Sequence, residues 1–244
     1  MTTDKNGMKT PARNAPVLFE EETTSTNTVL KDMASDLPHG SVLWSMRQSA
    51  GRGRSGRSFV SPDGGLYYSM ILKFPGPDER LTAATPLAAV AVVRALRAVC
   101  GMDTRIKWPN DVLTGEKKIC GILTESVICR DMMQMIVGIG INVNTSEFPG
   151  LAPGIACSVF SETGRKVDIA ALAQRLTLEL DGVYARLPET DPRDLSEYRA
   201  LCCTIGRRIS QGGTALRIND DFSLVTLLPD GTEKRIYFGE IFHE

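Results

Sequence analysis

Histidine is almost missing from this sequence. Only two histidines, His39 and His243, occur among its 244 residues. A histidine-based nucleophile triad, or a zinc site built from several histidines, is therefore nearly excluded by count. Any chemistry must rest on other side chains.

Three further features are absent. The six cysteines contain no CxxC spacing and the sequence shows no signal peptide, which indicates reduced thiols in the cytoplasm. The longest apolar run, residues 87–93, is far too short to span a bilayer. The net charge is −1, so the broad positive surface of a general nucleic-acid-binding protein is missing. What is present, a hydrophobic content of 42%, suffices for the core of one large or two modest domains.

Arginine and glycine are concentrated in residues 47–57, which hold four arginines and three glycines. Such a segment buries little apolar surface, so alone it should be mobile. Its glycines let the backbone approach a partner and its arginines match phosphate or carboxylate oxygens; a solvated surface loop is the alternative. The spacing Gly51-x-Gly53-x-x-Gly56 fits a dinucleotide fingerprint and nearly a P-loop. Pro62, however, prevents the helix that either motif must open.

A second polar group stands at the end of a predicted strand. Pro109 keeps Trp108 extended and ends the strand there. Lys107, Asn110 and Asp111 are thereby gathered at a strand terminus, where open sheets bind their ligands. A solvated turn is the alternative.

Glycines interrupt two long predicted strands that form a hairpin. Gly121 lies in the first strand, and Gly138 and Gly140 lie in the second. A glycine inside a strand indicates that something approaches the backbone closely. Lys118 enters the first strand close to Gly121, so a cation lies beside this approach.

The rest of the pattern predicts a mixture of strands and helices. The strands are expected at residues 17–19, 41–46, 66–72, 119–127 and 133–143. The helices are expected at 81–100 (beginning near Pro86), 168–187 and 195–202. The polar run 23–27 precedes another helical pattern, and its hydroxyl and amide groups are either N-caps or ligands for a polar head. Four short strands, at 207–210, 215–218, 223–228 and 234–238, form a small β module with a hairpin turn at 229–231.

Five motifs follow one another in an order seen in a known family. They are Ser25-Thr26-Asn27, the segment from Gln48 to Arg57, Lys107-Trp108-Pro109-Asn110-Asp111, Lys117-Lys118 with Gly121-Ile122-Leu123, and Gly138-Ile139-Gly140-Ile141-Asn142. With these motifs the chain resembles biotin protein ligases from about residue 17 to its end. The resemblance implies an α+β fold, with a mixed sheet and flanking helices followed by a small SH3-like β-barrel. We expect a disordered tail at 1–15, a catalytic domain at 16–202 and the C-terminal domain at 203–244.

The chain departs from the family at two places. Relatives usually have a longer excursion where this chain has only residues 209–213, which leaves open whether the barrel is complete. Bifunctional members add an N-terminal winged helix that binds DNA. The polar residues 1–15 cannot form one, so we expect a ligase without a repressor function. Gly239-Glu240-Ile241 is similar to the closing motif of the family.

The resemblance implies a reaction in two steps. Biotin and MgATP give biotinyl-5′-AMP and pyrophosphate, and the acyl group then passes to a lysine of a biotin carboxyl carrier protein. No dedicated protein ligands for Mg²⁺ are identifiable. The implied setting is cytoplasmic, with neither DNA nor a membrane as partner, and a homodimer is left open. A carboxylate that attacks a phosphate joins two anions, so a site rich in arginine and lysine suits this chemistry.

The resemblance also implies residue roles by position. The residues expected to bind biotin are Ser25, Thr26, Asn27, Gln48, Arg52, Gly53, Arg54, Lys118 and Gly121. Those expected to bind ATP or the adenylate are Arg52, Arg54, Arg57, Phe59, Asn110, Lys118 and Asn142. The residues expected to act in catalysis are Lys118, Arg54, Lys107 and Asp111. Phe59 stands where relatives often carry a tryptophan stacked on adenine, and the smaller ring should still stack.

Two alternatives remain beside this interpretation. A lipoate or octanoate ligase would share the fold and the lysine acceptor, and a non-catalytic phosphate- or RNA-binding module could use the basic loop. All assigned residues lie between Ser25 and Asn142, so we expect the small-molecule site to be complete without the C-terminal module. The module itself is expected to dock the carrier and to cover one end of the sheet.

Overall fold

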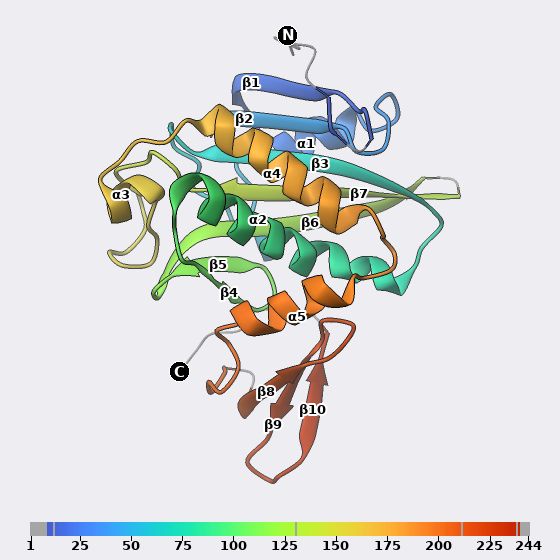
Figure 1. Cartoon of the computed structure of the whole chain (residues 1–244), viewed down its shortest axis with the longest axis vertical. Helices are drawn as coiled ribbons and strands as arrows, with labels where there is room; N and C mark the ends of the chain where they lie inside the picture. The colour runs from blue at the N-terminus through green and yellow to red at the C-terminus, as the bar shows by residue number, and fades with distance from the viewer. Residues whose placement is uncertain (1–8, 12, 130, 211, 238, 240–244) are drawn as a thin grey trace.

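The computed structural model describes residues 9–11, 13–129, 131–210, 212–237 and 239. Its centre is a seven-stranded sheet in the order β1-β2-β3-β7-β6-β5-β4 (Figure 1). The strands are β1 (Val17–Thr23), β2 (Val42–Gln48), β3 (Leu66–Pro75), β4 (Arg105–Lys107), β5 (Asp111–Thr114), β6 (Lys117–Cys129) and β7 (Met132–Ile141). Only β1 and β2 run parallel, and every other neighbouring pair in this sheet is antiparallel. The predicted mixed sheet is therefore confirmed.

Helices cover both faces of the sheet. α2 (Ala84–Cys100) and α4 (Ile169–Tyr184) lie side by side across one face, and α5 (Pro192–Leu201) lies below them, toward the C-terminal strands (Figure 1). The short helix α1 (Thr26–Asp32) covers the other face, where Leu30 packs on Leu43 and Ile71. Since successive strand residues point to opposite faces, β2 sends Val42 and Trp44 into the larger core and Leu43 toward α1.

The helix predicted within 81–100, with its start near Pro86, is confirmed, because α2 begins at Ala84 after a 3-10 turn at Glu79–Ala83. By length and composition the whole segment Glu79–Cys100 could cross a membrane, with a mean hydropathy of 1.6, and it is the one such helix among the described residues. In the folded chain 67% of this apolar stretch is buried. It therefore packs as the central core helix.

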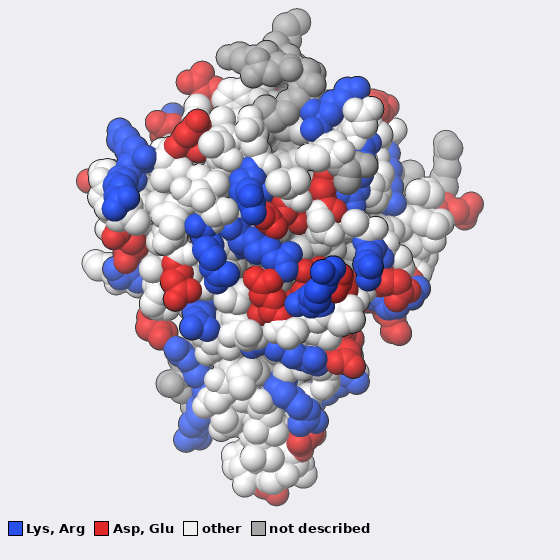
Figure 2. All heavy atoms as spheres, in the orientation of Figure 1, with Lys and Arg blue, Asp and Glu red and all other residues white. Residues whose placement is uncertain are grey.

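The charged side chains are distributed without a dominant sign. Figure 2 shows lysines and arginines interspersed with aspartates and glutamates over the face that carries α2, α4 and α5. This mixture agrees with the net charge of −1. Positive charge is concentrated elsewhere, in the pocket described below.

The C-terminal module is a three-stranded antiparallel sheet of β8 (Thr214–Ile218), β9 (Leu224–Leu227) and β10 (Glu233–Ile236). The strand expected at 207–210 is wrong, because the chain makes only an isolated bridge between Arg208 and Thr214 there. Gly212 and Gly213 have φ of 90° and 86° and turn the chain back within a few residues, so no paired strand develops. Of the expected closing motif at 239–241, residues 240 and 241 lie outside the described residues.

Part of the segment expected as a disordered tail packs on the fold. Residues 1–8 and 12 lie outside the described residues, but Thr10 and Ala15 are each only 1% exposed. Arg13 donates a hydrogen bond to Asp181 of α4, and the two side chains form an ion pair that is mostly buried. This contact joins the start of the described chain to the helix layer.

We predict that Asp181→Ala lowers the free energy of unfolding by about 3 kcal/mol, because the Arg13 guanidinium would stay buried without its partner. Glu179→Ala on the same helix is the matched control. It removes an i,i+4 pair between the half-exposed Arg175 and the mostly buried Glu179 and should cost about 1 kcal/mol or less. Urea unfolding of both variants measures the difference. Equal losses of unfolding free energy in the two variants would mean that the Arg13–Asp181 contact stabilises the fold no more than the control pair.

Candidate functional site

One pocket with a volume of about 320 Å³ contains every residue to which the sequence assigns a role. It lies where the start of α1, the end of β2, the glycine-bearing parts of β6 and β7, and the turn before β5 meet. The predicted residues that line it are Ser25, Thr26, Asn27, Gln48, Arg52, Gly53, Arg54, Arg57, Phe59, Lys107, Asn110, Asp111, Lys118, Gly121 and Asn142. Five segments separated along the chain thus form one site, and their individual roles stay predictions.

The pocket has a polar floor formed by the beginning of α1. Ser25 is at the N-cap position, yet its side chain makes no capping hydrogen bond. The side-chain oxygen of Gln48 accepts a hydrogen bond from the backbone N–H of Thr26 at 2.8 Å instead. Asn27 is only 5% exposed and donates to the backbone oxygen of Leu123 at 3.3 Å. The polar run 23–27 therefore supplies a hydrogen-bonding surface rather than a conventional side-chain cap.

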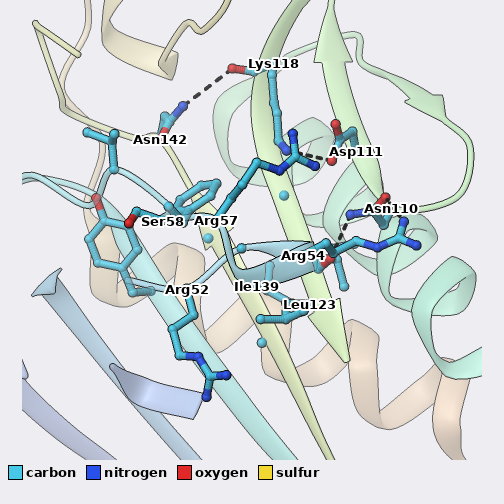
Figure 3. Close-up of a pocket in the computed structure, with 18 of the residues that line it drawn as sticks. Arg52, Arg54, Arg57, Ser58, Asn110, Asp111, Lys118, Leu123, Ile139 and Asn142 are labelled. Carbon is cyan, nitrogen blue, oxygen red and sulfur yellow. Dashed lines mark hydrogen bonds and ion pairs between the residues drawn. The ribbon is translucent and has the colours of Figure 1, made fainter. Parts of the chain in front are cut away.

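The arginine-glycine segment folds into a closed loop over the pocket. The loop is joined at its base by an isolated bridge between Arg52 and Ser58, and the Gly53 N–H donates to the Arg57 carbonyl at 2.7 Å. A single 3-10 turn, Arg54–Gly56, lies at its tip. Arg54 donates from Nη1 to Asn110 Oδ1 at 2.8 Å, and the two side chains lie next to each other (Figure 3).

The strand glycines are required by side chains that lie against the sheet. A Cβ on Gly140 would stand 2.5 Å from Phe59 Cε1, and one on Gly138 would stand 2.1 Å from Asn27 Oδ1. A Cβ on Gly121 would meet Lys118 Nζ at 2.9 Å as well as the Phe59 ring. The expected close approach to these strands is confirmed, and the approaching groups are the chain's own Phe59, Asn27 and Lys118.

Positive charge dominates the lining. The cationic residues are Arg52, Arg54, Arg57, Lys107 and Lys118, and Asp111 is the single carboxylate among the lining residues. Lys118 Nζ lies 2.7 Å from Asp111 Oδ1 and 5.8 Å from the centre of the Phe59 ring (Figure 3). Asp111 lies opposite Gly121 across the β5–β6 pair, which brings its carboxylate beside Lys118. Positive side chains are therefore gathered in one pocket with Lys118 among them.

A loop that sequence reasoning missed completes one wall. Phe148, Leu151 and Ile155 line the pocket, although Leu151 and Ile155 are 39% and 54% exposed. The Lys118 N–H donates to the Ile155 carbonyl, and the Cys157 N–H donates to the Lys118 carbonyl, both at 2.9 Å. These two hydrogen bonds fix the backbone of Lys118. No pattern in residues 145–156 distinguishes them from an ordinary surface loop.

Asn142 connects this loop to the sheet. Its side-chain nitrogen donates to the Cys157 carbonyl at 2.9 Å, and its backbone N–H donates to Ile119 at 2.9 Å. The other lining residues that the sequence did not indicate are Ser58, Val60, Tyr67 and Ala156. Tyr67 lies in an apolar strand, where a single hydroxyl does not indicate a ligand-binding residue.

The wall near Asn110 depends on the C-terminal part of the chain. The Trp108 indole N–H donates to the Phe222 carbonyl at 2.8 Å, and the Trp108 backbone N–H donates to Thr204 Oγ1 at 3.0 Å. Tyr198 also donates to the Pro109 carbonyl at 3.4 Å. The lining residues all precede residue 157, and the expectation that the small-molecule site is complete without the C-terminal module stays a prediction. That module holds the turn from which Lys107 and Asn110 project.

Burial keeps the nearby weak acids neutral. It raises the pKa of the Cys120 thiol well above its usual value, although the Lys118 charge acts in the opposite direction. Burial, reinforced by the charge of Asp63, likewise raises the pKa of Tyr67 far above that of a free phenol. Cys120 is therefore no thiolate nucleophile at neutral pH. Among the described residues no group of three or more His, Cys, Asp or Glu could hold a metal ion.

Comparison with known proteins gives a consistent result. Residues 19–142 match the biotin/lipoate A/B protein ligase family. The chain is 38% identical over 183 residues to the bifunctional ligase/repressor BirA of Bacillus spizizenii, which covers 73% of this chain and 56% of that protein. It is 37% identical over 154 residues to the biotin–[acetyl-CoA-carboxylase] ligase of Paracoccus denitrificans, which covers 60% of this chain and 63% of that protein. The chain thus spans little more than half the length of the Bacillus relatives.

A solved structure extends the likeness to the whole fold. The biotin protein ligase from Aquifex aeolicus in complex with biotin and ATP is similar with a TM-score of 0.76 at 28% identity. The likeness covers 93% of this chain and 98% of that one, so it includes the C-terminal module.

We predict that Gly140→Ala destabilises the fold by about 1–3 kcal/mol, because the new methyl group would displace the Phe59 ring. Gly182→Ala on α4 is the matched control, since its methyl group would meet no atom within 4 Å. In a helix this exchange should stabilise by up to about 1 kcal/mol. Chemical unfolding of both variants is the measurement. If Gly140→Ala is as stable as the control, the Phe59 ring does not lie against Gly140.

Proposed function

The chain belongs to the biotin/lipoate A/B protein ligase family, and we propose that it is a biotin protein ligase. It would activate biotin with ATP and transfer it to a lysine of a biotin carboxyl carrier protein. The observation that carries the proposal is the polarity of one pocket, with a hydrogen-bonding floor at α1 and five cations along the rest of its lining. Such a pocket suits a molecule with a polar ring at one end and a carboxylate at the other.

In the first proposed step a carboxylate oxygen of biotin attacks the α-phosphorus of ATP. A bond forms between this oxygen and phosphorus, and the bond to pyrophosphate breaks. Both reactants are anions, so fixed cations lower the barrier more than an acid or a base would. Lys118 is assigned to the meeting point because Asp111 holds its ammonium 2.7 Å away and its backbone is fixed by residues 155 and 157.

The three arginines divide between the two ligands. Arg54, held by Asn110, and Arg57 are assigned to the phosphates, and Arg52 to the biotin carboxylate. Phe59 is assigned to the adenine, and its ring is available at the pocket surface beside Gly140. A Mg²⁺ ion would arrive with ATP and keep its contacts with the phosphates. Asp111 alone among the lining residues is a carboxylate, and one carboxylate does not make a dedicated metal site.

In the second proposed step the amine of the acceptor lysine attacks the acyl carbon of the adenylate. A new amide bond forms, the bond to AMP breaks, and the amine loses a proton. No acyl-cysteine is needed, and the neutral, buried Cys120 agrees with a direct transfer. The six cysteines are free thiols, which supports the cytoplasm as the proposed setting.

A lipoate or octanoate ligase is the second candidate, because the same family contains such enzymes. Octanoate and lipoate carry no amide-like donors or acceptors at the end opposite their carboxylate, so they would gain little from the polar groups that Thr26 and Gln48 bring to the floor. The floor therefore favours a ring that carries hydrogen-bonding groups.

We predict that Lys118→Ala lowers biotin-dependent exchange of pyrophosphate into ATP by about 100-fold or more, because it removes the cation where two anions meet. Lys117→Ala is the matched control. Lys117 is the preceding residue, exposed and paired with Glu162 at 2.9 Å, so its variant should retain exchange within about threefold of the unmodified chain. A thermal melt shows that both variants fold. Near-normal exchange by a folded Lys118→Ala protein would contradict this role.

A further inference from the structure

The carboxylate of Glu125 lies outside the pocket lining but contacts two residues of that lining. Glu125 lies on β6, opposite Ile136 of β7, and its side chain is 19% exposed. Its Oε2 accepts a hydrogen bond from Asn27 Nδ2 at 3.0 Å. Its Oε1 lies 3.2 Å from Nη1 of Arg52, in the loop over the pocket. One side chain thus joins the floor of the pocket to its lid.

The contact with Glu125 fixes which way the Asn27 amide faces. An amide nitrogen has two hydrogens to donate, and here both are used, one for the Leu123 carbonyl and one for Glu125. The amide oxygen accepts from the Ser69 hydroxyl at 2.7 Å. A carboxylate only accepts, so a flipped Asn27 would turn its oxygen toward Glu125 and lose these bonds. Asn27 is therefore positioned and has no hydrogen left to donate to a ligand.

From Asn27 the hydrogen bonds continue along the floor. The Ser69 hydroxyl also lies 2.8 Å from Thr26 Oγ1, and Gln48 Oε1 accepts from the Thr26 backbone N–H. Gln48 in turn donates to Ser61 Oγ at 3.0 Å. Ser61 donates to the Phe59 carbonyl at 2.9 Å, which leads back into the loop. Glu125 is the one charged member of this network in the described part of the chain.

The contacts at the other end of the pocket form a separate set. Arg54 is held by Asn110, and Lys118 is held by Asp111. Glu125 touches neither pair in the interactions that the structure records. A change at Glu125 should therefore act on one end of the pocket more than on the other.

We propose that Glu125 is a positioning residue for the biotin end of the pocket, acting through Asn27 and Arg52. This inference rests on the proposed function. Glu125 sets the direction of the Asn27 amide and so the alignment of the floor. It also holds the Arg52 guanidinium beside the pocket, where the carboxylate of biotin would compete for it. The half-exposed Arg52 is thereby kept in place before the ligand arrives.

The test separates the two ends of the pocket by steady-state pyrophosphate exchange. Glu125→Gln keeps the shape of the side chain but presents an amide to Arg52 or to Asn27. We expect the KM for biotin to rise about tenfold and the KM for ATP to stay within about twofold, since hydrogen bonds to charged groups are lost only at the biotin end. Glu125→Ala, which loses both contacts, should raise the KM for biotin further.

Glu233→Gln is the matched control, because Glu233 forms an ion pair with Arg217 at 2.6 Å in the C-terminal sheet. It should leave both KM values within about twofold of the unmodified chain. All variants are assayed at temperatures below their measured melting transitions. A rise in KM then reports weaker binding and not unfolding. Unchanged KM values for biotin, or equal rises in both KM values, in folded Glu125 variants would overturn the proposal.

A double-mutant cycle tests whether Glu125 acts through Arg52. In an Arg52→Gln background, Glu125→Gln should raise the KM for biotin by less than in the unmodified chain, and the remaining effect belongs to Asn27. Full additivity of the two changes would contradict the link to Arg52. An unmodified chain without biotin-dependent exchange would instead contradict the proposed function, so the two failures are distinct.

Discussion

The pocket depends on three positions of the central strands that carry no side chain. Gly138 makes room for Asn27, Gly140 for the Phe59 ring, and Gly121 for both Phe59 and Lys118. A methyl group at the first two positions would overlap these side chains at distances below 2.6 Å. The floor, the aromatic surface and the central cation therefore all lie directly against the backbone of β6 and β7.

Three of the five cations of the pocket are held by a neighbouring side chain before a ligand binds. Lys118 lies beside Asp111, Arg52 beside Glu125, and Arg54 against the Asn110 side chain. Pre-oriented cations cost little reorganisation when an anion arrives, which is the condition for strong electrostatic stabilisation. The Trp108 contacts with Thr204 and Phe222 extend this support to the C-terminal sheet. The C-terminal part of the chain, which was expected to dock the carrier and to cover one end of the sheet, thus also contacts the turn that carries Lys107 and Asn110.

The sequence predicted site residues correctly where polar and charged side chains, or glycines, are close together along the chain. The arginine-glycine segment, the turn with Lys107 and Asp111, and the strand glycines were each visible as short patterns, and all of them line one pocket. The pattern could not reveal Glu125, because its partner Asn27 lies 98 positions away and a glutamate in a strand resembles ordinary alternation. For the same reason the Trp108–Phe222 hydrogen bond, 114 positions apart, was not predicted. The strand expected at 207–210 was wrong because two glycines turn the chain before it can pair.

The central claim is that one pocket selects an acid with a polar ring and joins it to AMP. The most direct test is pyrophosphate exchange into ATP by the unmodified chain, with biotin, lipoate and octanoate supplied separately. The account predicts exchange with biotin at least about 100-fold faster than with either of the other acids, because only biotin carries a ring that can form hydrogen bonds with the polar floor. Exchange with octanoate or lipoate that equals or exceeds exchange with biotin would contradict it.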